Sequence, residues 1–126
     1  MLAPEPLRGI RVVGSREVLD AIEWSDDVVA MRLAPDDLFA LGATTVVLPD
    51  GGALVADETG FVGWWLDATQ VDELVDAHVE WELPEELPAL AQGLVAGVPA
   101  KLWLDADRGL LLCAAGYAHE LQERLP

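Results

Sequence analysis

The clearest alternation of apolar and polar positions lies in the last third of the chain. Every second residue of 98–104 is apolar, which is typical of a β-strand with one buried face. Turn-forming residues at 105–109 interrupt the pattern, and the apolar run 110–115 then predicts a second, doubly covered strand. From residue 117 to 125 the apolar spacing becomes helical. The pattern therefore predicts a hairpin followed by a closing helix.

A strand and a helix are also predicted in the middle of the chain. Residues 61–66 form a strongly apolar run that is rich in β-forming side chains. Thr69 is expected to cap the next helix, with Asp72 as its partner in a capping box. Apolar positions within 71–79 share one helical face, while acidic residues occupy the other.

The first third of the chain carries weaker signals of the same kinds. Residues 1–8 contain two prolines and are expected to form a surface tail. A short strand is predicted at 9–13, and Ser15 is expected to cap a helix after it. The β-rich segment 28–33 predicts a further strand.

Several segments between these elements are turns or are ambiguous. We expect a hairpin with strands at 44–48 and 53–56, followed by a turn at 57–60. The segment 35–41 begins like a helix but also fits a turn and a strand. The segment 89–96 fits either a short helix or an extended strand.

This order of elements predicts an α+β fold. Two or three helices would pack on a mainly antiparallel sheet, within a single domain that covers residues 9–126. A chain of 126 residues is close to the commonest domain size. It is long enough to bury a core without disulfides or metals.

The charge composition limits the classes of partner that the chain is expected to bind. The chain has 23 acidic and 7 basic residues, a net charge of −16, so we expect no binding to nucleic acid or to anionic membranes. Larger protein subunits or self-association are the partners that remain. No apolar run approaches the ~20 residues that span a bilayer, and no leader pattern opens the chain, so a cytoplasmic location is expected.

The sequence contains no recognisable catalytic or metal-binding pattern. Cys113 is the single cysteine and lies in an aliphatic run, which indicates a buried, inert thiol. His78 and His119 have no nearby cysteine or histidine at ligand spacing. We therefore predict no catalytic residues and no metal site, and we expect no enzymatic activity of the chain's own.

Tryptophan is the unusual residue, with five in the chain. Trp64 and Trp65 are neighbours in one expected strand and must project to opposite faces. Either both faces are covered, or one indole contacts a ligand or a partner. Trp103 lies opposite the aliphatic face of its strand and leaves the same alternatives open.

Several segments resemble the gamma subunit of heterotetrameric sarcosine oxidase and, more broadly, the aminomethyltransferase-like, folate-binding superfamily. Residues 31–42 resemble that family's Leu-Gly-Pro-Asp-Glu-Trp-Leu-Leu segment. Residues 61–84 resemble its strand–helix–Pro-Leu-Asp-Leu passage, and residues 91–104 and 110–125 resemble its closing hairpin and helix. The family's Asp-Val-Ser strand has no counterpart at 55–57.

The resemblance implies ferredoxin-like βαβ halves and a strand at 38–41. It also implies an accessory subunit with no cofactor of its own, since flavin and active site would belong to larger subunits. The alternative is a small-molecule binding domain. In that case an aromatic pocket around Trp64 or Trp65 would hold a folate- or pterin-like ring, with Asp57 or Glu58 as polar partners.

Overall fold

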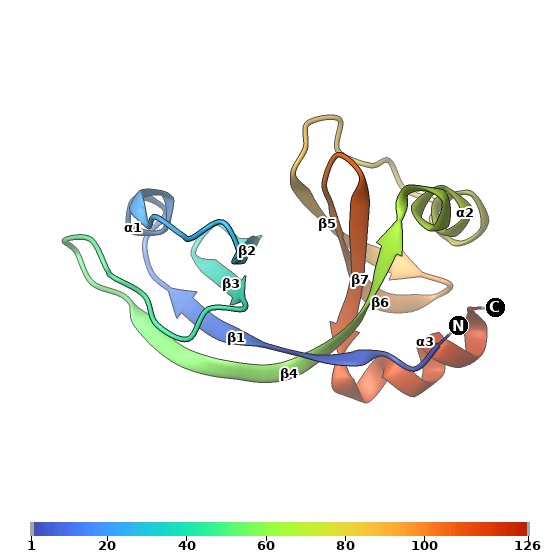
Figure 1. Cartoon of the computed structure of the whole chain (residues 1–126), viewed down its shortest axis with the longest axis horizontal. Helices are drawn as coiled ribbons and strands as arrows, with labels where there is room; N and C mark the ends of the chain where they lie inside the picture. The colour runs from blue at the N-terminus through green and yellow to red at the C-terminus, as the bar shows by residue number, and fades with distance from the viewer. Residues whose placement is uncertain (1, 126) are drawn as a thin grey trace. The chain divides into compact units, whose positions relative to one another are not determined.

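The chain forms two compact units. The computed structural model describes residues 2–125, which contain seven strands, three α-helices and one 3-10 turn (Figure 1). One unit is Leu7–Thr59, and the other is Gly60–Pro126 together with the N-terminal residues as far as Pro6. All strand pairs within each unit are antiparallel, so the predicted α+β class with a mainly antiparallel sheet is confirmed.

The Leu7–Thr59 unit has strand order β2-β3-β1. Its core includes Ile10, Leu19 and Leu38. The Ser15 hydroxyl accepts a hydrogen bond from the backbone N–H of Val18, as predicted for an N-cap. The elements are β1 (Glu5–Val13), α1 (Arg16–Ala21), β2 (Val29–Ala34) and β3 (Asp37–Leu41).

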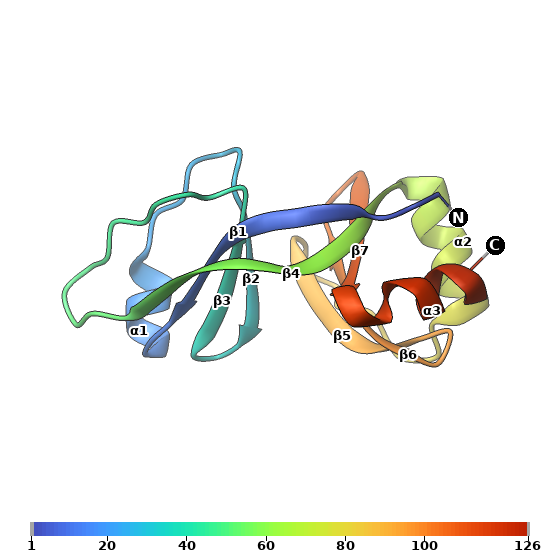
Figure 2. The same cartoon turned by 90° about the horizontal axis from the view of Figure 1, so that it is seen from below.

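The Gly60–Pro126 unit has strand order β4-β7-β6-β5. Helices α2 and α3 lie on the same side of this sheet, and both contribute leucines to one core (Figures 1 and 2). The elements are β4 (Leu54–Asp67), α2 (Ala68–His78), β5 (Ala89–Val95), β6 (Val98–Leu104), β7 (Arg108–Ala114), the 3-10 turn η1 (Ala115–Tyr117) and α3 (Ala118–Arg124).

Strand register decides which side chains meet the helices. Trp64 pairs with Leu111, which pairs with Leu102, and this row belongs to the core under α2 and α3. Trp65, Leu110 and Trp103 form the next row and therefore project to the opposite face. Because Leu110 is fully buried as well, this sheet is covered on both faces at its centre.

Two ambiguous segments are resolved as strands. Asp37–Leu41 is β3 and Ala89–Val95 is β5. In the first segment, pairing on both sides with β1 and β2 overrides the local helix signals. In the second, Ala96 and Gly97 adopt positive φ and make the tight turn into β6.

The expected hairpin at 44–56 and the turn at 57–60 are wrong. Residues 44–53 contain no strand, and β4 runs without interruption from Leu54 to Asp67. Turn-forming residues within β4 are accommodated because their side chains lie on exposed or half-buried positions, and Glu58 forms an ion pair with Arg11. The expected surface tail is also shortened, since β1 begins at Glu5 and Leu7 is buried.

The predicted start of α2 and the ferredoxin-like half expected around α2 also need correction. Asp67, not Thr69, is the N-cap: its carboxylate accepts from the Gln70 N–H, and the Gln70 side chain accepts from the Asp67 N–H. A ferredoxin-like βαβ half needs parallel strands around its helix. In the Leu7–Thr59 unit, β1 and β2, which α1 connects, are both antiparallel to β3 and therefore run in the same direction. In the Gly60–Pro126 unit, β4 and β5, which α2 connects, stand at the two ends of an antiparallel order and run in opposite directions.

Candidate functional site

Trp64 and Trp65 have different environments on the two faces of β4. Trp64 is 5% exposed, and its indole N–H donates to the carbonyl oxygen of Leu2 at 2.7 Å. The polar edge of this buried ring is therefore satisfied, and only its aromatic surface remains for contacts. Trp65 is 38% exposed, which makes it the indole of the pair that is available to a partner.

Trp65 belongs to a cluster with Trp103 and Arg108, which we call the indole–arginine cluster. The two indoles meet edge to face, with centroids 6.0 Å apart and planes at 87°. The guanidinium carbon of Arg108 lies 4.7 Å from the Trp65 ring centroid and 5.4 Å from that of Trp103. Such cation–π contacts fix the orientation of an exposed arginine. Trp103 is buried and contacts both of the other side chains.

Arg108 is exposed and forms no ion pair with any residue of 2–125. Asp67 and Asp107 line the same shallow depression as Arg108 and Trp65, but neither carboxylate is paired with the guanidinium. The cluster therefore presents a guanidinium group, oriented by its contacts with the two indoles, beside an exposed aromatic ring. Tryptophan and arginine are the residue types most enriched at the energetic centres of protein interfaces.

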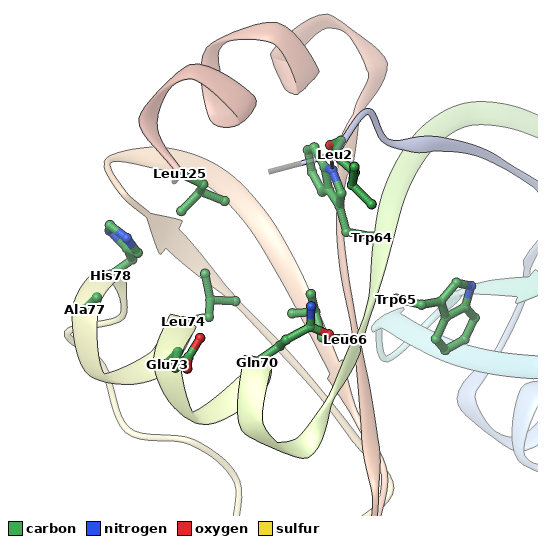
Figure 3. A pocket seen from close by; sticks show the side chains of 10 residues that line it. All are labelled: Leu2, Trp64, Trp65, Leu66, Gln70, Glu73, Leu74, Ala77, His78 and Leu125. Carbon is green, nitrogen blue, oxygen red and sulfur yellow. Dashed lines mark hydrogen bonds between the residues drawn. The ribbon is translucent and has the colours of Figure 1, made fainter.

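A separate pocket of about 460 Å³ lies beside Trp64, between α2 and the end of α3 (Figure 3). Its walls are mostly apolar, and its polar lining groups are Gln70, Glu73 and His78, all from α2. This volume is within the range of small-molecule sites. Although Trp65 borders the pocket, its ring projects away from the other lining side chains (Figure 3). The lining residues are Leu2, Trp64, Trp65, Leu66, Gln70, Glu73, Leu74, Ala77, His78 and Leu125.

The capping box that starts α2 also orients one lining residue of this pocket. The Gln70 side-chain oxygen accepts from the Asp67 N–H at 2.9 Å, and the Gln70 N–H donates to the Asp67 carboxylate at 2.8 Å. Because the amide oxygen is held in this way, the side-chain orientation of Gln70 is set by the helix start.

The expected acidic partners lie elsewhere. Glu58 forms an ion pair with Arg11, which also makes a bidentate pair with Asp37 at 2.8 and 2.7 Å. The hydrogen bond to Asp37 is the main cause that raises the pKa of Arg11 above the ordinary arginine value. Asp57 is exposed on β4. Neither Asp57 nor Glu58 lines the tryptophan pocket, so the structure does not bring the five predicted site residues together.

Other reactive side chains are dispersed. Cys113 is buried, and desolvation raises the pKa of its thiol. His119 is exposed and lies 3.1 Å from Glu123, while His78 borders the pocket. Within residues 2–125 there is no group of three or more histidine, cysteine, aspartate or glutamate side chains that could hold a metal ion.

Comparison of the chain with protein-family models, curated proteins and solved structures found no significant match. None of the helices described is long and apolar enough to cross a membrane. These comparisons therefore assign no function to the chain.

Sequence reasoning missed several residues of these sites, among them Gln70, Glu73 and Arg108. A signal for Gln70 was present, because it follows Asp67 at the spacing of a capping box. Arg108 gave no such signal, because its place beside Trp65 depends on the pairing of β4 with β7.

Proposed function

We propose that this chain is a non-catalytic interaction domain that binds a larger protein subunit through the indole–arginine cluster. The observation that carries the proposal is the Arg108 guanidinium, which is stacked on Trp65 and has no carboxylate partner among the residues described. On a chain of net charge −16, such a group is suited to a carboxylate on the partner's surface.

The proposed partner follows from the resemblance to sarcosine oxidase gamma subunits. The chain would act as a gamma-type accessory subunit, and a larger sarcosine oxidase-like subunit would carry the flavin and the chemistry. The absence of a recognisable catalytic cluster among the described residues is compatible with this role.

The test is purification of the chain from its native host, followed by mass spectrometry and an absorbance scan for flavin. Stoichiometric recovery of a large, flavin-containing subunit is the expected result. Trp65→Ala and Arg108→Ala should each abolish recovery, because they remove the exposed halves of the cluster. Arg16→Ala is the matched control, since Arg16 is an exposed arginine of the other unit.

Recovery of the chain alone, without any stoichiometric partner, would contradict the interaction function. Recovery of a partner that Trp65→Ala and Arg108→Ala retain would leave the function standing but place the interface elsewhere. A partner without flavin would contradict the sarcosine oxidase-like assignment.

A second candidate function is small-molecule binding, which the pocket beside Trp64 supports by its volume and its aromatic wall. A folate- or pterin-like ring is the ligand that the resemblance suggests, with Gln70 and Glu73 replacing Asp57 and Glu58 as the polar partners. Folate titration monitored by tryptophan fluorescence tests this candidate. A saturable change is expected, and a flat titration would reject folate.

A further inference from the structure

We infer that the pocket beside Trp64 takes an amphipathic cation, a flat apolar body that carries a protonated amine. The inference rests on the small-molecule function proposed above and names the ligand class for that site. It differs from the folate hypothesis in the sign of the ligand's charge.

The apolar walls select the body of the ligand. Trp64, Leu66 and Leu74 belong to the buried core under the helices and also border the pocket. Because the Trp64 N–H is already bonded to Leu2, the 5% of this side chain that is exposed offers aromatic edge or surface but no hydrogen-bond donor. An aromatic wall favours a planar ring, and it also attracts a cation placed over its face.

The ionisable groups select the charge. Among residues 2–125, Glu73 and His78 are the ionisable side chains in the lining, and no lysine or arginine borders the pocket. A carboxylate-bearing ligand such as folate would therefore meet the Glu73 carboxylate without a fixed cation to compensate. The net charge of −16 adds a long-range potential of the same sign. Both terms favour an amine over an acid.

Glu73 is well placed to contribute this discrimination. It is an exposed side chain of α2 that lines the pocket, while Leu74, next to it in sequence, is buried and lines the same pocket (Figure 3). An amine bound there would keep part of its hydration, so the charge pair should improve affinity by about 5-fold rather than by orders of magnitude.

The experiment uses three ligands with one ring and three charges: 2-(1-naphthyl)ethylamine, 2-(1-naphthyl)ethanol and 1-naphthaleneacetate. Binding is measured by calorimetry at pH 7.5, and the site is located by amide chemical shifts. We expect the amine to bind most tightly, the alcohol about 5-fold more weakly, and the acid most weakly of the three. Shifts should concentrate in α2 and β4.

Three variants locate the effect. Glu73→Gln should reduce amine affinity to that of the alcohol and leave the alcohol unchanged. Asp76→Asn makes the same change of charge on the same helix outside the pocket, and should alter amine affinity by less than about 2-fold. Ala77→Leu fills the pocket from an exposed helix position and should weaken amine and alcohol alike.

Several results would overturn the inference. They are tighter binding of the acid or of folate than of the amine, equal loss in Glu73→Gln and Asp76→Asn, or no binding by any of the three ligands. The interaction function is tested separately, because Glu73→Gln and Ala77→Leu should still recover the partner subunit. Failure of the cation site and failure of the interface are therefore distinguishable.

Discussion

The two units of the chain use arginine in opposite ways. In the Leu7–Thr59 unit, Arg11 binds Asp37 and Glu58, and its charge is satisfied within the unit. In the Gly60–Pro126 unit, Arg108 is held by stacking on Trp65 and has no carboxylate partner in the part of the chain described. The first arginine joins strands together, whereas the second is oriented but still able to bind something else.

The two units also differ in the cavities described above. The pocket beside Trp64 and the depression at the indole–arginine cluster are both lined by residues of the Gly60–Pro126 unit. Under the proposals made above, the Gly60–Pro126 unit would carry both recognition sites and the Leu7–Thr59 unit would act as a scaffold. Four predictions test this division.

The largest effect is expected from truncation of the two cores. Leu19→Ala and Leu121→Ala remove buried leucines from one unit each, and each should lower the free energy of unfolding by about 2–5 kcal/mol. Urea unfolding monitored by circular dichroism measures both. A loss below about 1 kcal/mol in either variant would mean that the core of that unit is not packed as described.

A smaller loss is expected where strands approach closely in the scaffold unit. A Cβ added at Gly9 would lie 2.1 Å from the carbonyl oxygen of Ala40 on the paired strand, so Gly9→Ala should cost about 1–3 kcal/mol or more. Gly116→Ala is the control, because nothing lies within 4 Å of its added Cβ. Thermal unfolding compares them, and equal midpoints would refute the close β1–β3 pairing.

Removal of the scaffold arginine should have a moderate effect. Arg11→Ala removes the ion pairs that Arg11 makes with two half-buried carboxylates and should cost about 1–2 kcal/mol after allowance for partial exposure. The pKa of Arg11 is raised, so the stability that its guanidinium charge contributes is not lost by deprotonation of Arg11 until the pH rises beyond the ordinary arginine value. Urea unfolding should therefore give the same difference in free energy of unfolding between Arg11→Ala and the unchanged protein at pH 7 and at pH 9.

The smallest effect on stability is expected at the recognition arginine. Arg108→Ala removes an exposed cation–π contact and should lower the free energy of unfolding by less than about 1 kcal/mol. The same denaturation assay used for Arg11→Ala provides the comparison. If Arg108→Ala proved the more damaging of the two, Arg108 would have to be counted as part of the scaffold.

Much of the fold followed from local patterns, and the failures have local causes. The period of two at 98–104 and the helical spacing after residue 117 correspond to β6 and α3. The false hairpin at 44–56 came from Asp50-Gly51-Gly52, where turn-forming residues occur without strands to join. Turn propensity alone does not distinguish these cases, because strand pairing is decided by distant partners.

The site was less predictable than the fold. Adjacency was enough to place Trp64 and Trp65 on opposite faces, but their exposure depends on the rows formed with β7 and β6. Glu58 was expected beside an aromatic pocket, yet its partner is Arg11, which is 47 residues away in the sequence. Contacts of this kind depend on register and leave no local trace.

The capping box at Asp67 and Gln70 has a consequence for evolution. Glutamate can replace glutamine at this position of a capping box, and a single-base change converts either glutamine codon into one for glutamate. Gln70→Glu would therefore preserve the start of α2 while adding a second carboxylate to the pocket. Because stability would be retained, descendants of this gene can strengthen the preference of the pocket for cations in one step without losing the fold.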